Sequence, residues 1–343
     1  MTLPAVFGLS GPKLIEDERS FFRDADPVGY ILFARNCVDR PQLRVLTDEL
    51  RSLAGRDVAI LIDQEGGRVA RMRPPEWPAF PPGGAFNRLY ELAPVSALEA
   101  VRCNAEAIGL MLAEVGINVD CLPLLDVIST ATHDAIGDRA LGSDPLQVAS
   151  LGRAALDGLA AAGVTGVIKH MPGQGRATSD THHALAVVDA AREDLSAADF
   201  RPFRQLREAV IGMTAHVVYR AVDPELPATL SPTVIGEVIR GEIGFDGLLL
   251  SDDLDMHALS GSIAERAVGC IAAGCDVALN CWGRMDDMVA IAEALPPLSQ
   301  DGQARLGRVM AGRMAVAWNA ERFAALTAKR DDLLALESAS ANA

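Results

Sequence analysis

The stretch from Lys169 to His183 concentrates side chains that can exchange protons or bind anions. It carries one Lys, three His and one Asp, and it follows an apolar run, residues 164–168, that is typical of a buried strand. Pro172 and two nearby glycines cannot continue a helix or a central strand, so we expect a long loop at a strand end. Because loops mounted on a rigid scaffold often carry chemistry, we interpret this loop as a candidate site rather than a solvated connection.

The triplet Asp180-Thr181-His182 has the spacing of a proton-transfer pair. Residues two apart in an extended segment project to the same side, so Asp180 can hold the His182 imidazole in one tautomer and favour its protonated form. His182 could then donate a proton to a leaving oxygen and, once neutral, take one from water. A surface His beside a surface Asp has the same spacing, so the spacing alone leaves both interpretations open.

Polar side chains stand where nearly every predicted strand ends. Asp252 ends a run of hydrophobic and small residues, which suits a deep carboxylate that attacks an electrophilic carbon. Asp253 would point to the other face, and alternation alone does not decide which of the two faces the interior. Because carboxylates, amides and cations can bind vicinal hydroxyls, the set favours a polyhydroxylated ligand. The other polar strand ends are Arg35-Asn36, Asp63 to Arg68, Asp126, Lys169-His170, His216 and Asn280.

Strand-like and helix-like segments alternate along the whole chain, which predicts parallel strands joined by helices. About eight such units favour an α/β fold of the TIM (β/α)8 barrel type, irregular near Pro123, with a doubly wound open sheet as the alternative. No linker or repeat divides the chain, so we expect a single catalytic domain over residues 1–336 and a frayed tail over 337–343. The predicted strands cover residues 6–9, 29–33, 58–63, 117–126, 164–168, 211–215, 247–252 and 276–280, and the clearest helices 97–115, 146–162, 200–210, 232–243 and 263–273.

Composition restricts the partners and the compartment. The chain has 343 residues, half of them hydrophobic, and a net charge of −15, which disfavours nucleic acid and anionic membrane surfaces as partners. The N-terminus lacks the pattern of a signal peptide, no apolar run reaches the roughly 20 residues of a membrane span, and the six cysteines form no C-x-x-C pair. We therefore expect a reduced, cytoplasmic protein whose partner is a small molecule; its oligomeric state stays open.

A metal or cofactor is not expected. The sequence contains no H-E-x-x-H motif, and the adjacent His182 and His183 would point apart. Gly173-Gln174-Gly175 lacks the third glycine and the following helix of a dinucleotide-binding fingerprint.

Several motifs together resemble the family-3 glycoside hydrolases, and among them the short bacterial β-N-acetylglucosaminidases of cell-wall recycling. The similarity extends over roughly residues 7–282, in the family's order and approximate spacing. The motifs are Asp63-Gln64-Glu65-Gly66-Gly67-Arg68-Val69, Gly137-Asp138-Arg139, Lys169-His170-x-Pro172-Gly173-x-Gly175, Asp180-x-His182, Phe245-Asp246-Gly247 and Ser251-Asp252-Asp253-Leu254.

This resemblance implies a retaining mechanism. Asp252 would be the nucleophile that forms a covalent glycosyl-enzyme, and His182, paired with Asp180, the acid/base. The expected substrate is a terminal β-linked N-acetylglucosamine on anhydro-muropeptides. The family positions that hold the sugar correspond to Asp63, Arg71, Arg139, Lys169 and His170.

The sequence departs from the family pattern at a few positions. Met171 and Gln174 stand where Phe and His are frequent, and Ala140-Leu141 where Ser-Phe is frequent. Gln174 removes an imidazole from the catalytic loop but leaves every residue with an implied chemical role in place. Two alternative functions remain: a β-N-acetylglucosaminide phosphorylase, since a His acid/base repels phosphate less than a carboxylate does, and a non-catalytic muropeptide sensor.

Overall fold

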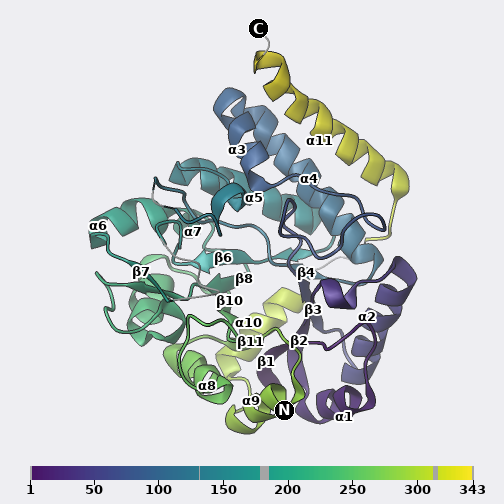
Figure 1. The fold of residues 1–343 in the computed structure, drawn as a ribbon, viewed down its shortest axis with the longest axis vertical. Coiled ribbons are helices and arrows are strands. Elements are labelled where there is room, and N and C mark those ends of the chain that lie inside the picture. Colours follow the sequence, from purple (N-terminus) through teal and green to yellow (C-terminus); the bar gives the residue numbers. More distant parts are fainter. Residues whose placement is uncertain (1, 131, 178–184, 312–315, 342–343) are drawn as a thin grey trace.

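The computed structural model describes residues 2–130, 132–177, 185–311 and 316–341, which form a barrel of parallel strands surrounded by helices (Figure 1). Eight strand positions surround the barrel axis. They are β1 (Leu3–Gly8), β2 (Pro27–Leu32), β3 (Ala59–Ile62), β4 (Val119–Asp120), β5 (Thr165–Gly166) continuing into β6 (Ile168–Met171), β8 (Ile211–Thr214), β10 (Leu248–Asp253) and β11 (Val277–Asn280).

The pairing of these strands closes the sheet on itself. Neighbours follow the order β5-β4-β3-β2-β1-β11-β10-β8-β6, and every pairing is parallel. Only Val167 separates β5 from β6, so the first and last members of that order are one stretch of chain. The predicted barrel is therefore confirmed and the open doubly wound sheet is wrong.

Helices follow the strands and have local reasons to begin and end where they do. The Asp39 side chain accepts a hydrogen bond from Gln42 N at 2.7 Å at the start of α2, which ends at Gly55 in the left-handed conformation. The described helices are α1 (Glu16–Ala25), α2 (Arg40–Ala54), α3 (Gly83–Leu92), α4 (Pro94–Glu114), α5 (Pro145–Ala161), α6 (Arg192–Asp194), α7 (Arg201–Gln205), a helical segment at Val234–Glu242, α8 (Ile263–Ala273), α9 (Met285–Ala294), α10 (Gln300–Ala311) and α11 (Ala320–Ala341).

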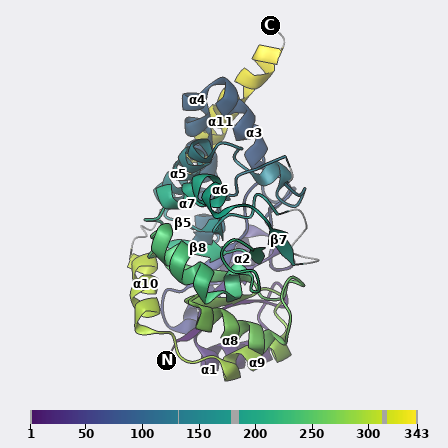
Figure 2. The same ribbon diagram turned by 90° about the vertical axis from the view of Figure 1, so that its left-hand side faces the viewer.

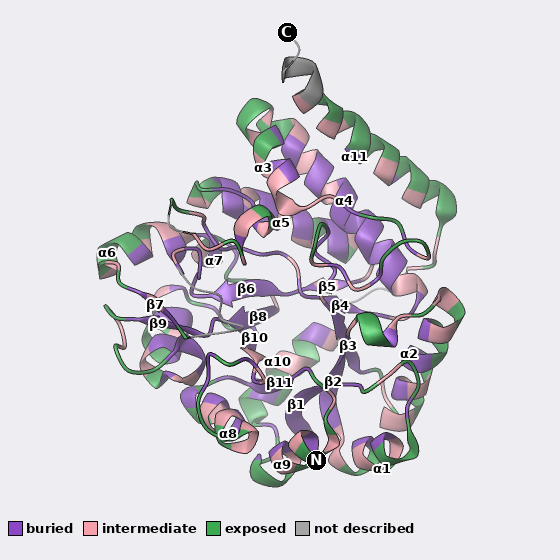
Figure 3. Ribbon diagram, viewed as in Figure 1, coloured by how far each residue is buried: buried purple, intermediate pink, exposed green. Residues whose placement is uncertain are grey.

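Two apolar layers hold the barrel together, because successive strand residues face opposite sides. One cluster joins side chains from all eight strand positions, such as Val6, Leu61 and Leu279, and therefore fills the interior. The other joins the outward side chains, such as Phe7 and Ile60, to the surrounding helices. Figure 3 shows the strands buried at the centre and the exposed residues on the outer faces of the helices.

The last helices close one end of the barrel and lengthen the molecule beside α3 and α4. From α10, Val309 joins the interior cluster, and Arg305 binds Asp276 Oδ1 at 2.9 Å beside the start of β11, so α10 covers the end where the strands begin. Helix α11 lies along α4 and leads to the C-terminus at the tip of the long axis (Figure 2). It continues to Ala341, where the sequence had predicted a frayed tail from 337. In the described part of the chain, no helix is long and apolar enough to cross a membrane.

Two elements differ from the sequence-based expectations. The predicted strand over 117–126 is regular only at β4, and the rest of it runs as an irregular segment around Pro123, which cannot donate to a sheet. A small parallel pair, β7 (Ala186–Val188) with β9 (Val217–Tyr219), was not predicted and lies outside the barrel sheet. It holds the chain in place just after residues 178–184.

The contact between α4 and α5 depends on a small residue, which gives a stability prediction. A Cβ added at Gly158 in α5 would lie 2.4 Å from Arg102 O and 2.9 Å from Ala105 Cβ in α4. Because backbone must move to relieve such overlap, we expect Gly158→Ala to lower the free energy of unfolding by about 1–3 kcal/mol in urea denaturation. The control is Gly307→Ala in α10, where an added Cβ meets nothing within 4 Å; helix propensity should raise stability there by about 0.5–1 kcal/mol. Equal effects at the two sites would contradict this view of the helix contact.

Candidate active site

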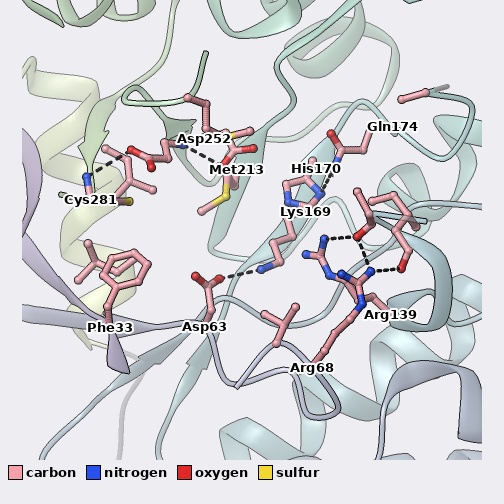
Figure 4. A pocket seen from close by; sticks show the side chains of 18 of the residues that line it. Phe33, Asp63, Arg68, Arg139, Lys169, His170, Gln174, Met213, Asp252 and Cys281 are labelled. Atoms are coloured by element: carbon pink, nitrogen blue, oxygen red, sulfur yellow. Dashed lines mark hydrogen bonds and ion pairs between the residues drawn. The ribbon is translucent and has the colours of Figure 1, made fainter. Parts of the chain in front are cut away.

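A polar cavity of about 250 Å³ opens at the end of the barrel where the strands finish (Figure 4). Six of the eight site residues predicted from sequence line it: Asp63, Arg71, Arg139, Lys169, His170 and Asp252. The other two, Asp180 and His182, lie outside the described residues. Further polar residues in the lining are Arg68, His133, Gln174 and Asp253.

A buried ion network forms one side of the cavity. The Lys169 ammonium lies 2.9 Å from Asp63 Oδ1 and 2.7 Å from Glu65 Oε1. Lys169 lies in β6, and the two carboxylates follow β3, from which β4 separates it in the barrel. Arg71 binds the other Asp63 oxygen at 2.9 Å, and Arg139 grips Glu65 with two bonds of 2.8 Å. Three cations thus surround two carboxylates.

This network keeps all of its members charged. Burial alone would raise the pKa of Glu65, but the neighbouring Arg139 and Lys169 outweigh it and lower that pKa to about 2. Asp63 is held below its usual pKa in the same way, with Lys169 and Arg71 opposing burial. Burial would lower the pKa of Lys169, whereas Asp63 and Glu65 raise it above its ordinary value. Fixed charges of both signs can donate to and accept from sugar hydroxyls.

His170 is held by two groups at the same ring nitrogen. Its Nδ1 lies 2.8 Å from Asp126 Oδ2 and 2.9 Å from the Gln174 side-chain amide. A nitrogen that donates to the carboxylate cannot also accept from an amide N–H, so we assign the proton to Nδ1 and turn the oxygen of Gln174 toward it. That orientation gives a partner to the Gln174 oxygen, which otherwise has none among the described residues. Gln174 thus supports the His170 ring from the loop that follows β6.

Asp252 carries the carboxylate suited to nucleophilic attack. It is half-buried at the end of β10, and its Oδ1 accepts a hydrogen bond from Asp253 N at 2.8 Å. Burial would raise the pKa of Asp252, but His170, His216 and that backbone N–H together hold it below its usual value. The carboxylate is therefore ionised at neutral pH, as a nucleophile must be.

Asp253 also lines the cavity, which simple strand alternation does not allow for two successive residues. The register between β10 and β11 shifts between Leu250 and Asp253, and this irregularity turns both side chains inward. Burial and the nearby Asp255 raise the pKa of Asp253 well above its usual value. The environment thus favours the protonated form of Asp253 and the ionised form of Asp252.

Several other polar strand ends have structural partners instead of a place in the cavity. The Asn36 side chain caps the turn after β2 by accepting from Phe33 N at 2.8 Å. His216 is buried between Thr229 Oγ1 and Asp253 O, at 2.7 and 2.8 Å, and Asn280 donates to Asp255 at 2.8 Å. Their role is to hold the strands that carry cavity residues.

Two residues of the site had no role in the sequence analysis. Glu65 pairs with both Lys169 and Arg139, and its position two residues after the strand-end Asp63 was the available signal. His133 reaches the cavity from the loop after β4, and its surroundings in the sequence contain no pattern that marks it. Among the residues that the structure describes, no group of three or more His, Cys, Asp or Glu side chains is arranged to hold a metal ion.

A closed parallel barrel with a carboxylate nucleophile candidate and a sugar-compatible ion network at its strand ends has the features expected of a glycoside hydrolase. Residues 5–311 match the glycosyl hydrolase family 3 N-terminal domain, and the chain belongs to this family.

Similar proteins agree with this assignment. A β-hexosaminidase of Aromatoleum aromaticum (strain DSM 19018 / LMG 30748 / EbN1) is 36% identical over 88% of this chain and 86% of its own length, and one of Alkalilimnicola ehrlichii (strain ATCC BAA-1101 / DSM 17681 / MLHE-1) is 38% identical over 89% and 88%. The crystal structure of NagZ from Neisseria gonorrhoeae in complex with N-trifluoroacetyl-D-glucosamine superposes with a TM-score of 0.86 at 30% identity, covering 98% of both chains.

The ion network predicts a pH-dependent loss of stability when its central cation is removed. Lys169→Met leaves Asp63 and Glu65 buried with one Arg each, and we expect a loss of about 3 kcal/mol at pH 7 in urea denaturation. The depressed pKa of Glu65 stabilises the fold above its unfolded value of about 4.3, and this contribution disappears as pH falls toward about 2. The difference between variant and wild type should therefore shrink between pH 5 and pH 2.

The matched control is Arg44→Met, which removes a half-exposed ion pair with Asp48 on α2. Such a pair contributes about 0.5 kcal/mol or less, so stability should hardly change at any pH. A Lys169→Met penalty that stayed constant on acidification would show that lost packing, and not the charge network, causes it.

Proposed function

We propose that the protein is a retaining exo-β-N-acetylglucosaminidase that releases terminal β-linked N-acetylglucosamine from anhydro-muropeptides during cell-wall recycling in the cytoplasm. The observation that carries this proposal is the position of Asp252, ionised and facing the same cavity as the Lys169–Asp63–Glu65 network. One wall thus carries a nucleophile and another carries hydroxyl-binding charges.

The proposed reaction proceeds in two steps. In the first, an Asp252 oxygen attacks the anomeric carbon, the bond to the leaving oxygen breaks, and His182 gives its proton to that oxygen. In the second, neutral His182 takes a proton from water, which attacks the anomeric carbon and releases Asp252. Asp180 would hold the His182 ring and stabilise the imidazolium before each transfer to a leaving group.

The dimensions of the cavity support an exo-acting enzyme. Its volume of about 250 Å³ is below the range of about 300–1,000 Å³ that accommodates drug-sized ligands, so it suits one sugar residue better than a longer chain. The N-acetyl group is proposed from the similar proteins. Two of them are named β-hexosaminidase, and the NagZ structure from Neisseria gonorrhoeae is a complex with N-trifluoroacetyl-D-glucosamine. Lys169, Arg71 and Arg139 provide local positive charge for an acidic muropeptide despite the net charge of −15.

Replacement of the nucleophile tests the proposal directly. We expect Asp252→Asn to lower kcat for an aryl β-N-acetylglucosaminide by about a thousandfold or more, because no covalent intermediate can form. The wild type should prefer this substrate over the aryl β-glucoside and should release the β-anomer first, as seen by NMR, with no sugar 1-phosphate in phosphate buffer.

The control for that variant is Asp253→Asn, which makes the same change at the neighbouring carboxyl, whose pKa burial and Asp255 raise. It should retain most of the turnover. Near-normal activity of Asp252→Asn, or release of the α-anomer, would refute the proposed mechanism. Sugar 1-phosphate as the product would favour the phosphorylase instead, and tight binding without any turnover the sensor.

The acid role of His182 predicts a dependence on the leaving group. With His182→Ala, we expect hydrolysis of phenyl β-N-acetylglucosaminide, whose leaving group needs a proton, to slow by about a hundredfold or more. A dinitrophenyl glycoside leaves without protonation and should lose far less in the rate of its first step, measured as a pre-steady-state burst. Equal losses for both substrates would exclude His182 as the proton donor.

A further inference from the structure

Two arginine side chains in the cavity wall share one backbone oxygen. Arg68 and Arg139 both line the cavity and lie next to each other there (Figure 4). Arg68 Nη2 donates to Ala135 O at 2.7 Å, and Arg139 Nη1 donates to the same oxygen at 3.1 Å. A carbonyl oxygen has two lone pairs and can accept both bonds. The Ala135 carbonyl therefore couples the position of Arg139 to that of Arg68.

The protein uses three of the five N–H groups of Arg139. Its Nε and Nη2 each donate to the Glu65 carboxylate at 2.8 Å, and its Nη1 donates to Ala135 O. One N–H on Nη1 and one on Nη2 are left without a partner among the described residues. Because bonds on two sides fix the plane of the guanidinium, these two N–H groups keep one direction before a ligand arrives.

Arg68 also holds the turn that presents Ala135 O. Its Nη2 donates to Asp134 O at 2.6 Å, and its Nε donates to Asp138 Oδ1 at 2.9 Å, so one guanidinium spans the turn from residue 134 to residue 138. The ion pair with Asp138 is half-exposed and therefore weak. The bonds from Arg68 to the backbone oxygens are thus the main restraint on this turn.

The hairpin that carries Arg68 also carries Glu65, and it is rigid. Gly66 and Gly67 have φ values of 97° and 54°, which allow a sharp reversal of the chain. The hairpin is closely packed, because a Cβ added at Gly66 would lie 2.3 Å from a backbone oxygen. One rigid unit consequently holds Arg139 from two sides, through Glu65 directly and through Arg68 by way of the turn.

We propose that Arg68 is a positioning residue that holds the 134–138 turn and thereby keeps the Arg139 guanidinium in the orientation that binds an oxygen of the sugar. This inference rests on the proposed function, in which Arg139 binds the sugar. Arg68 takes no part in the chemical steps. Its removal frees backbone oxygens at the surface, which water can bind, so we expect sugar binding to weaken while the fold remains.

A double-mutant cycle of Arg68→Met and Arg139→Lys tests this indirect role. Lysine at position 139 keeps a cation beside Glu65 but lacks the planar fork and its two remaining N–H groups. With an aryl β-N-acetylglucosaminide, we expect Arg68→Met to raise KM about tenfold and to change kcat by less than about twofold. In the Arg139→Lys background, the same replacement should change kcat/KM by less than about twofold, because the fork that Arg68 positions is gone.

The matched control is Arg73→Met. The exposed Arg73 donates to Ala70 O at 2.6 Å and to Arg68 O at 3.0 Å, and in the described part of the chain it has no hydrogen bond to the 134–138 turn. Its replacement should leave KM within about twofold of the wild-type value. Additive losses in the cycle would show that Arg68 acts independently of Arg139 and would overturn the proposal. An unchanged KM in Arg68→Met, or an equal rise in Arg73→Met, would overturn it too.

Thermal unfolding of each variant shows whether the fold is kept. If Arg68→Met lowers the unfolding temperature, Arg68→Lys takes its place in the cycle, because lysine keeps the charge and loses the fork that spans the turn. The same criterion then decides: a loss that disappears in the Arg139→Lys background supports the positioning role, and a loss that persists there overturns it.

Failure of the proposed function would be a different result. If the wild type did not hydrolyse the glycoside, that function would fall, and calorimetric binding of N-acetylglucosamine by the proteins of the cycle would test Arg68. Coupled losses of affinity would support the positioning role, and additive losses would overturn it. A wild type that neither hydrolysed the glycoside nor bound the sugar would overturn both proposals.

Discussion

The burial of Lys169 between Asp63 and Glu65 is the interaction on which the site depends. Removing three charges from water costs several kcal/mol for each ion, and only close pairing with further hydrogen bonds offsets that cost. Arg71 and Arg139 provide this further pairing, because with them each carboxylate binds two cations. The network consequently fixes β3, β6 and the loop after β4 relative to one another. The same groups are pre-arranged to exchange hydrogen bonds with sugar hydroxyls without reorganisation.

Described structure anchors both flanks of the segment that carries Asp180 and His182. Before it, Ala177 O accepts from His133 N at 3.1 Å; after it, β7 pairs with β9. The Tyr219 hydroxyl in β9 donates to Gly173 O at 2.8 Å, so β9 is also bonded to the chain that precedes the segment. The described contacts thus hold the two ends between which Asp180 and His182 lie in the sequence.

The sequence predicted the barrel because buried parallel strands are continuous apolar runs. It predicted Asp63, Lys169, His170 and Asp252 because polar groups followed those runs, whereas Arg71 and Arg139 were predicted from the family resemblance. Other features depend on contacts between distant segments. The pairing of β7 with β9 has no local signal, since each strand has three residues. His133 reaches the cavity only because Arg68 and Arg139 hold its loop.

The adjacent carboxyls of Asp252 and Asp253 show how one backbone irregularity assigns two chemical roles. A regular strand would point them to opposite faces, but the register shift between β10 and β11 brings both to the cavity. Repulsion between two adjacent carboxylates disfavours ionisation of both at once. Asp255 and burial raise the pKa of Asp253, whereas His170 and the Asp253 N–H help to hold that of Asp252 low. In many active sites, the acid and base roles of two titratable groups are assigned by environments that push their pKa values apart. Asp252, the residue directly after Ser251 in the motif, is thereby the more readily ionised of the two.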